Sequence, residues 1–419
     1  MHYDNPSFQT TTLPNGLTIH AATVESRWQA LYFVVHSGAA QDPLGFEGLA
    51  HFVEHTVSEN IPRYATKDVG RFLKRIGDLS RLGQTCFLDT NYFYYSRATL
   101  EYLEKGIKIY GGMLIDSPLN QNIEREREVI LGEICNYHNT PYSHRLALLS
   151  AQALYPEASP LHRYASGLGS KESVLRITPR DLQEFYKRHY CPKNISIIAI
   201  GKLALEELVK LFKDSSFGAD NKPGERSPVE TPLPIAPLPF ITRCEIRMSD
   251  YFTSQPDSGF YICSTILPGT IQFEVMKILV EMLKDALSRA IREDKGWLYD
   301  VRVWHEGYGS LRRLDISCEE LSWKAMAEIE VIIEKTILSL SQDKELFEDV
   351  QGCMIERSDI EEATIREICR NAAEDLIVQG RIITAQERKK NFKDLTLAEI
   401  GRALEELKPE RRWTAISVP

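Results

Sequence analysis

The sequence predicts an α+β fold of two structurally related halves, each an antiparallel-rich mixed sheet flanked by helices, joined by a proline-rich linker. Three observations support this fold. Short strand-like runs alternate with longer amphipathic runs along the chain. Residues 219–240 contain a series of prolines, which favours a semi-extended connection near the middle of the 419 residues. The order of strand and long helix predicted for 91–114 recurs at 311–340, as expected of a repeated unit.

The first half opens with a hairpin and a third strand. Pro14-Asn15-Gly16 is typical of a tight turn, and it separates the strand-like runs 8–13 and 17–20. The apolar run 30–35 predicts the third strand, and the loop behind it leads into a helix that carries the motif described below.

The remaining elements are predicted from the spacing of apolar residues. Helices are expected over 67–76, 100–114, 122–138, 179–190, 270–292 and 323–340, and strands over 91–96, 195–200, 258–266 and 311–318. We therefore expect a first domain over residues 1–218, the linker over 219–240 and a second domain over 241–419.

The stretch Gly48-Leu49-Ala50-His51-Phe52-Val53-Glu54-His55-Thr56 predicts a metal site. It reads as a helix on which His51, Glu54 and His55 share one face, because residues three and four apart are neighbours on a helix. Two imidazoles at this spacing can grip a metal such as zinc. Glu54 would then be placed to take a proton from a water molecule. Since a lone histidine pair is more often structural, a metal site requires a third ligand.

A second predicted helix offers that ligand. Glu126 and Glu133 are seven residues apart, so they lie on one stripe of the helix predicted over 122–138. Glu133 is the predicted third ligand. Considered alone, this helix is more typical of a solvated, charge-rich helix in which Glu126 pairs with a nearby Arg or Lys.

Together, the two stretches resemble the short members of the pitrilysin family of zinc peptidases (peptidase family M16). That family has the pattern His-x-x-Glu-His with a distant glutamate, which is preceded seven residues earlier by another acid. Here Glu133 follows His55 by 78 residues, and Glu126 holds the earlier place. The resemblance implies that His51, His55 and Glu133 bind one Zn²⁺ per chain. It also implies that Glu54 is the general base and that Glu126 supports a ligand from behind.

The second half carries a further pattern, Arg292-x-x-x-Gly296-x-x-Tyr299, at a predicted helix end, glycine stop and short strand. By itself the pattern is typical of a charged helix terminus followed by a packed strand tyrosine. In the pitrilysin family, an Arg and a Tyr in this context bind the substrate carbonyl and stabilise the oxyanion. The resemblance therefore implies catalytic and substrate-binding roles for Arg292 and Tyr299.

One segment departs from the family pattern. The family usually has Gly-Gly-x-x-Asn-Ala-x-Thr on an edge strand that pairs with the peptide. This sequence has Gly77-Asp78-Leu79-Ser80-Arg81-Leu82-Gly83-Gln84-Thr85, with one additional residue and with Leu82-Gly83 in the place of Asn-Ala. Strand addition uses main-chain groups, so Leu82 and Gly83 are still expected at the substrate. The departure bears on substrate preference and rate.

Composition and charge exclude several classes of function. The net charge of −9 and the pI near 5.7 leave no basic field for a nucleic-acid partner. No apolar run approaches the ~20 residues needed to span a bilayer, so no membrane partner is expected. No secretory signal is visible, and the eight cysteines are scattered without a Cys-x-x-Cys pair, which is typical of reduced thiols. We therefore expect a cytoplasmic protein.

These features predict a zinc-dependent endopeptidase that hydrolyses short or unfolded peptides, held as an extended strand in a chamber between two halves. The alternative is a non-catalytic peptide-binding or assembly subunit that keeps the fold, or a subunit that needs a partner chain for activity. Because one chain carries both the metal motif and the Arg/Tyr pair, the resemblance implies a homodimer. A heterodimer with a related chain is the other possibility.

Overall fold

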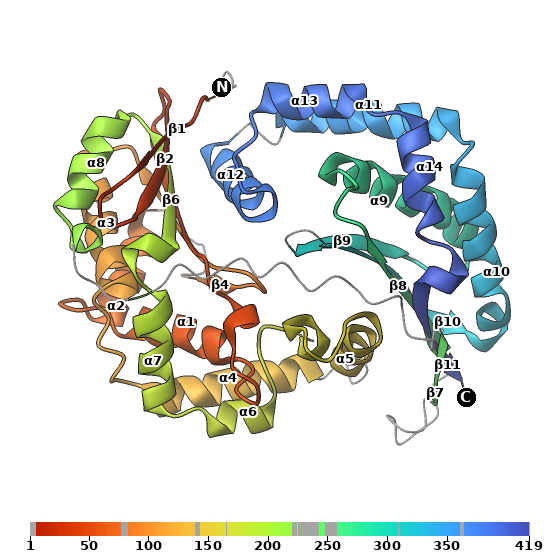
Figure 1. Ribbon diagram of the computed structural model, residues 1–419, viewed down its shortest axis with the longest axis horizontal. Helices are drawn as coiled ribbons and strands as arrows, with labels where there is room; N and C mark the ends of the chain where they lie inside the picture. The colour runs from red at the N-terminus through yellow and green to blue at the C-terminus, as the bar shows by residue number, and fades with distance from the viewer. Residues whose placement is uncertain are drawn as a thin grey trace. The chain divides into compact units, whose positions relative to one another are not determined.

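The computed structural model describes residues 6–76, 83–138, 143–164, 166–219, 224, 243–247, 258–308, 311–360 and 364–418 (Figure 1). The chain forms two compact units. The first contains Met1–Asn139, Tyr164–Val229 and Glu361–Thr384, and the second contains Thr140–Arg163, Glu230–Ile360 and Ala385–Pro419. Each unit has its own sheet and its own hydrophobic core. The predicted linker over 219–240 lies outside the described residues, apart from Ala219 and Gly224.

The first unit is built on a six-stranded mixed sheet in the order β1-β2-β6-β3-β5-β4. Its strands are β1 (Gln9–Thr12), β2 (Thr18–Thr23), β3 (Trp28–Val35), β4 (Gln84–Thr85), β5 (Thr90–Arg97) and β6 (Ile195–Gly201). β2 and β6 pair in parallel, and the other neighbours pair antiparallel. The short strand β4 forms one edge of this sheet. At the predicted hairpin turn, Gly16 has a φ of +89°, a conformation that glycine adopts readily.

Helices cover both faces of the first sheet. They are α1 (Leu49–Glu59), α2 (Thr66–Ile76), α3 (Leu100–Leu114), α4 (Ile123–His138), α6 (Lys171–Arg176), α7 (Pro179–His189), α8 (Leu205–Lys213) and α12 (Ile365–Gln379). Short 3-10 turns lie at Ala39–Gln41, Pro192–Asn194 and Ser216–Gly218.

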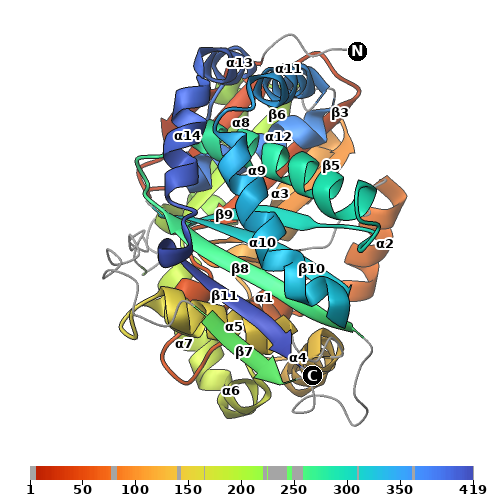
Figure 2. The same cartoon turned by 90° about the vertical axis from the view of Figure 1, so that its right-hand side faces the viewer.

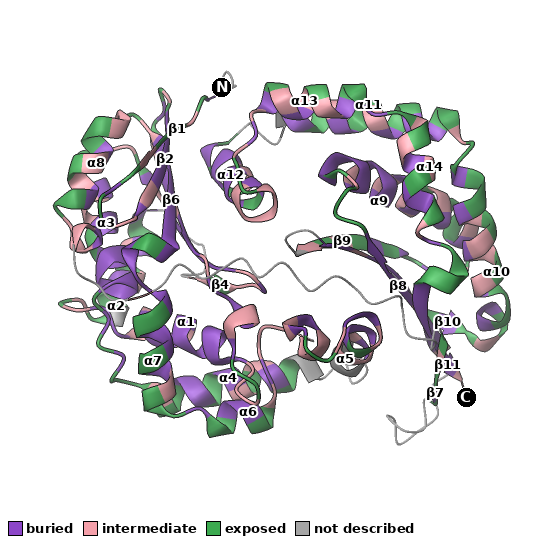
Figure 3. Cartoon of the chain, viewed as in Figure 1, coloured by how far each residue is buried: buried purple, intermediate pink, exposed green. Residues whose placement is uncertain are grey.

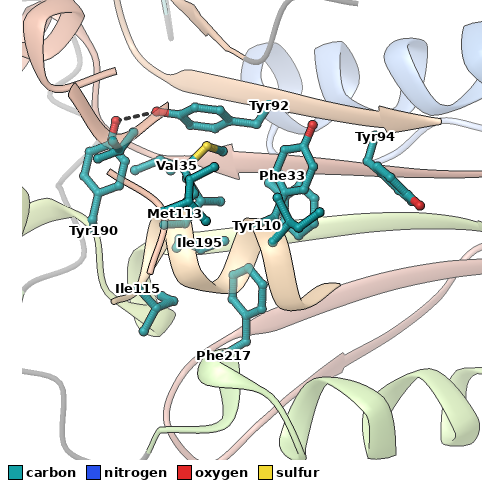
Figure 4. Close-up of a cluster of buried hydrophobic side chains, with 14 of the residues drawn as sticks. Phe33, Val35, Tyr92, Tyr94, Tyr110, Met113, Ile115, Tyr190, Ile195 and Phe217 are labelled. Carbon is teal, nitrogen blue, oxygen red and sulfur yellow. Dashed lines mark hydrogen bonds between the residues drawn. The ribbon is translucent and has the colours of Figure 1, made fainter. Parts of the chain in front are cut away.

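Strand β3 explains why this sheet needs helices on both sides. Phe33 belongs to the core shared with α1 and α3, where it stacks on Tyr110 at 4.8 Å and on Phe217 at 5.5 Å between ring centroids (Figure 4). Ala30 and Val34 alternate with it and pack on the opposite face, against buried residues of α12 (Figure 3). A strand buried on both faces has apolar residues at successive positions, as the sequence run 30–35 does.

The second unit contains a five-stranded sheet in the order β7-β11-β8-β10-β9 (Figure 2). Its strands are β7 (Arg243–Arg247), β8 (Ser258–Leu267), β9 (Arg302–Tyr308), β10 (Leu311–Ser322) and β11 (Arg412–Val418). Its helices are α5 (Ser143–Leu154), α9 (Phe273–Leu287), α10 (Trp323–Leu340), α11 (Lys344–Ile360), α13 (Ala385–Asp394) and α14 (Leu397–Glu405). Short 3-10 turns lie at Pro160–Arg163 and Pro409–Arg411.

The two sheets share one topology, which confirms the prediction of two similarly built halves. β7 and β11 pair in parallel, as β2 and β6 do, and the neighbours β11-β8-β10-β9 pair antiparallel, as β6-β3-β5-β4 do. In each unit, one helix follows the central strand: α1 follows β3, and α9 follows β8. α9 contains no histidine, so the metal motif belongs to the first unit alone.

The compact units differ from the predicted domains, which were continuous segments. Helix α5 falls inside the predicted first domain but belongs to the second unit, where it contacts β8 and β11. Helix α12 falls inside the predicted second domain but belongs to the first unit, where Ile365 and Ile368 join the core on β3 and β6. The boundaries 1–218 and 241–419 are therefore wrong for these two helices, because each one buries its apolar face on the sheet of the other half.

Two further expectations for the second half need correction. The helix predicted over 270–292 is α-helical only over Phe273–Leu287 and ends in a π-helical turn at Ser288–Glu293. No strand contains Tyr299, which lies in a bend before β9. Among the helices that the structure describes, none has both the length and the apolar composition that crossing a membrane requires.

Candidate metal centre and catalytic site

Helix α1 presents His51, Glu54 and His55 from one face, as predicted. The helix starts after Gly48, whose φ of +93° favours glycine. The buried carboxylate of Asp42 accepts hydrogen bonds from the backbone amides of Gly48 at 2.7 Å and of Ala50 at 2.8 Å. A negative charge at a helix N-terminus is favourable, so Asp42 fixes the first turn of the metal helix.

Helix α4 packs on α1 and brings two carboxylates to the histidines (Figure 1). Oε2 of Glu133 lies 3.6 Å from Nε2 of His51 and 3.6 Å from Nε2 of His55. Oε2 of Glu126 lies 3.2 Å from Nδ1 of His55, on the other side of that ring. The seven-residue spacing therefore places both glutamates at the histidine pair, as predicted.

The environment of the two histidines moves their pKa values in opposite directions. Burial, followed by the neighbouring His55, lowers the pKa of His51 to about 4. Burial also acts to lower the pKa of His55, but the carboxylates of Glu133, Glu54 and Glu126 outweigh it and raise that pKa to about 9. The three carboxylates therefore give the position of His55 a net attraction for positive charge.

The donor set fits a divalent metal. One atom from each of His51, His55 and Glu133 lies within 4.8 Å of the others. Two imidazoles and one carboxylate are a set of protein ligands used for catalytic zinc. Nδ1 of His55 donates to Glu126, which leaves Nε2 as the ligand atom, and this carboxylate–histidine arrangement is typical of metal-bound histidines. Nδ1 of His51 is buried and has no hydrogen-bond partner among the described residues.

Glu54 lies beside this cluster in a buried position. Oε2 of Glu54 accepts a hydrogen bond from the hydroxyl of Thr85 on β4 at 3.0 Å. Burial raises the pKa of Glu54, while the positive charge of His55 and the Thr85 hydroxyl act against burial. A cleft of about 380 Å³ opens here, lined by the metal cluster, by Gly83–Thr85 and by Gly167-Leu168. A carboxylate with a raised pKa at the wall of a cleft is suited to receiving a proton.

Arg292 and Tyr299 lie together in the second unit. The guanidinium carbon of Arg292 lies 5.0 Å from the centroid of the Tyr299 ring, a cation–π contact. Gly296 between them has a φ of +65° and ends the helix, as predicted. Tyr299 is 85% exposed, so it is not a packed strand tyrosine, which was the alternative to a functional role.

The remaining predicted site residues are Leu82 and Gly83. Leu82 lies outside the described residues. Gly83 lines the cleft, next to Glu54. Two contributors to this site were not predicted from the sequence. Thr85 was named only within the segment 77–85, and Asp42 was given no role. Asp42 lies six residues before Gly48, too far for the local capping pattern that marks a helix start.

Comparison with known proteins places both halves of the chain in one family. Residues 20–164 match the family model described as insulinase (peptidase family M16), and residues 176–351 match the model described as peptidase M16 inactive domain. The second description agrees with the absence of histidine from α9.

Individual relatives are more distant. The chain is 28% identical over 247 residues to a probable mitochondrial-processing peptidase subunit beta of Arabidopsis thaliana, which covers 58% of this chain and 44% of that protein. It is 26% identical to an uncharacterized zinc protease of Mycobacterium tuberculosis, over 54% of this chain and 49% of that protein. These matches thus span about half the length of the curated relatives. A solved protease from Helicobacter pylori has the same fold, with a TM-score of 0.82, 15% identity and coverage of 99% and 100%.

Proposed function

The chain belongs to peptidase family M16, and from this premise we propose that it is a zinc-dependent endopeptidase that hydrolyses short or unfolded peptides. The observation that carries the proposal is the convergence of His51, His55 and Glu133 beside a buried glutamate, Glu54. Zinc proteases among the relatives support the choice of metal.

In this proposal, His51, His55 and Glu133 hold one Zn²⁺ per chain. When bound there, zinc would act as a Lewis acid toward water and the peptide carbonyl. Glu126 holds the His55 ring by its Nδ1–H, so that Nε2 keeps its lone pair toward the ligand position. Two ligands come from one helix and the third from a helix packed on it, so the cluster is held by the core of the first unit.

Glu54 is the proposed general base. It takes a proton from the water that attacks the peptide carbonyl and then delivers it to the departing amine. Burial raises the pKa of Glu54, which favours its taking the proton in the first step.

Arg292 and Tyr299 are the proposed groups that bind the substrate carbonyl and stabilise the oxyanion. The guanidinium and the phenol are both hydrogen-bond donors, and the cation–π contact between them fixes one against the other. The high exposure of Tyr299 leaves its hydroxyl free to reach a ligand.

The proposed substrate is an extended peptide that pairs with the edge strand β4. β4 borders the cleft, and its outer edge has no neighbouring strand in the described sheet. Gly83 directly precedes this strand. Leu82 lies outside the described residues, and its contact with the substrate stays a prediction. The enclosing chamber expected from the resemblance stays a prediction.

We further propose that the working particle is a homodimer in the cytoplasm, because one chain carries both the metal residues and the Arg/Tyr pair. A heterodimer is the alternative, and it is supported by relatives that are named as beta subunits. A non-catalytic, peptide-binding role is the competing function. It is favoured by the match of residues 176–351 to a model described as inactive and by the departure at 77–85.

The test is cleavage of a mixed library of unstructured peptides by the purified protein, with and without a chelator and zinc add-back, while its mass in solution is recorded. Chelator-sensitive cleavage by a particle of twice the chain mass supports the proposal in full. No cleavage by zinc-loaded protein, at any mass, contradicts the self-sufficient peptidase and supports either a subunit that needs a partner chain or the peptide-binding alternative.

A further inference from the structure

We propose that the edge strand β4 positions the catalytic carboxylate, with Thr85 holding one oxygen of Glu54 and the missing side chain of Gly83 making room for the other. This inference rests on the proposed function and adds a second role to β4, besides pairing with the peptide. Thr85 and Gly83 are positioning residues, because they act through Glu54.

The contact with Thr85 fixes the first oxygen. Oγ1 of Thr85 donates to Oε2 of Glu54 at 3.0 Å. Glu54 lies on α1 and Thr85 lies on β4, so this hydrogen bond joins the helix to the strand. A hydrogen bond to an ionised carboxylate is stronger than one between neutral groups, and it selects one rotation of the carboxylate plane.

Gly83 determines the space for the second oxygen. A Cβ atom on Gly83 would lie 2.7 Å from Oε1 of Glu54 and 2.8 Å from its Cγ. The same atom would lie 2.7 Å from Cε1 of Tyr92, a fully buried ring whose hydroxyl bonds Tyr190 at 2.9 Å. A methyl group at 83 therefore requires both neighbours to give way, and the flexible end of the Glu54 side chain is freer to move than the buried Tyr92 ring.

The strand itself is held in place from behind. The backbone amide of Ala39 donates to Cys86 O at 3.0 Å, and that of Ala40 donates to Phe87 O at 2.8 Å. A Cβ on Gly38 would lie 2.4 Å from Cys86 O, so this loop and the turn after β4 are in close contact. These contacts anchor the chain directly after β4 and so limit how far β4 can shift for a larger residue at 83.

The close approach of Glu54 explains why this chain has glycine at position 83. The family pattern has alanine at this place, and the sequence alone left the substitution unexplained. In this chain a methyl group at 83 and the observed position of Glu54 exclude one another. The departure from the family pattern is therefore coupled to where the general base lies.

Three variants test the inference: Thr85→Val, Thr85→Ser and Gly83→Ala. Two more, Thr12→Val and Gly70→Ala, are the matched controls. Thr12 is exposed on the far edge strand β1, and a Cβ on Gly70 meets nothing within 4 Å. We expect Thr85→Val to lower kcat about ten-fold, the effect of losing one hydrogen bond to a charged group. We expect Gly83→Ala to lower kcat about 100-fold, the effect of misplacing a catalytic group by about 1 Å. KM and zinc content should stay unchanged, Thr85→Ser should restore kcat, and the controls should match the wild type.

Crystal structures of the wild type, Thr85→Val and Gly83→Ala give a readout that does not depend on activity. The inference expects the Glu54 carboxylate to rotate in the first variant and to be displaced in the second, with β4 unmoved. An unmoved carboxylate in both variants, or equal kcat in an active wild type and Thr85→Val, overturns it. If the wild type cleaves no peptide, the self-sufficient peptidase proposed above fails, and the structures still decide whether β4 positions Glu54.

Discussion

The carboxylate of Glu126 lies directly behind His55 and accepts a hydrogen bond from Nδ1 at 3.2 Å, while Nε2 of the same ring faces Glu133 at 3.6 Å. Glu126 is itself held, because the guanidinium of Arg125 donates to its other oxygen at 2.9 Å and also bonds Glu59. The ring of His55 is therefore fixed by a chain of charged groups before any ligand arrives.

Replacing Glu126 should weaken metal binding without removing a ligand. We expect Glu126→Gln to raise the zinc dissociation constant about ten-fold or more, because groups that orient a ligand have effects of this size. Competition with a chromogenic chelator measures the constant. Glu128→Gln is the matched control, since Glu128 is exposed on the same helix. Equal constants for Glu126→Gln and Glu128→Gln would show that Glu126 does not orient His55 for metal binding.

Removal of the metal should lower the stability of the first unit. A ligand that binds only the folded state stabilises it by about 4 kcal/mol at a thousand times its dissociation constant. We therefore expect a chelator to lower the unfolding midpoint of the wild-type protein, measured by circular dichroism. The variant His51→Asn should bind less than one zinc per chain, and its midpoint should not respond to the chelator. A response as large as that of the wild type would contradict the role of His51.

The Arg/Tyr pair should affect turnover and not the fold. Tyr299 is 85% exposed, so Tyr299→Phe should change the free energy of unfolding by less than about 0.5 kcal/mol. Loss of an oxyanion donor should lower kcat by about 100-fold. Asp300→Asn, at the exposed neighbouring position, should leave kcat unchanged. Steady-state kinetics and thermal unfolding of both variants separate the two effects, and an unchanged kcat in Tyr299→Phe would remove Tyr299 from the mechanism.

His189 on α7 should make stability depend on pH. Burial lowers its pKa from 6.5 to about 4, so the folded state favours the neutral ring. The stabilisation is present above pH 6.5 and is lost as the pH falls toward 4, by about 3 kcal/mol in full. Buried Asp89, with a pKa raised to about 6, acts in the opposite direction over an overlapping range. The comparison is therefore between the wild type and His189→Gln, in urea unfolding at pH 7.5 and pH 5.

That comparison has a definite sign. From pH 7.5 to pH 5 the free energy of unfolding should fall by about 2 kcal/mol more in the wild type than in His189→Gln. At pH 5 the His189 ring is mostly protonated in the unfolded state and mostly neutral in the folded state. Parallel losses in both proteins would mean that His189 is accessible to protons in the folded state.

The sequence predicted elements well wherever local pattern determines structure. Residues 100–114 and 323–340 were expected as helices and are α3 and α10 with the same bounds, because each has an apolar stripe that packs on its own sheet. Helices α5 and α12 were not predicted. The sequence also could not show to which unit each of them belongs. Each packs on the sheet of the other half, and no local pattern records which sheet a helix will cover.

Part of the candidate site could likewise be predicted from local spacing, and part of it depends on contacts between distant residues. The spacing within 51–55 and between Glu126 and Glu133 is helical, so the cluster could be predicted once both helices were expected to meet. The contact between Thr85 and Glu54 depends on how β4 lies across α1, thirty-one residues away in sequence. Gly83 is small because Glu54 and Tyr92, distant in sequence, lie against it in the fold. The sequence alone therefore showed only a departure from the family pattern.

The most direct test of the account is the variant Glu54→Gln, compared with the wild type for zinc content and for cleavage of an unstructured peptide. The amide nearly matches the carboxylate in shape but cannot accept a proton from water. The account predicts one zinc per chain in both proteins, with hydrolysis lowered by at least about 100-fold in the variant. Undiminished hydrolysis by zinc-loaded Glu54→Gln would contradict the assignment of Glu54 as the general base.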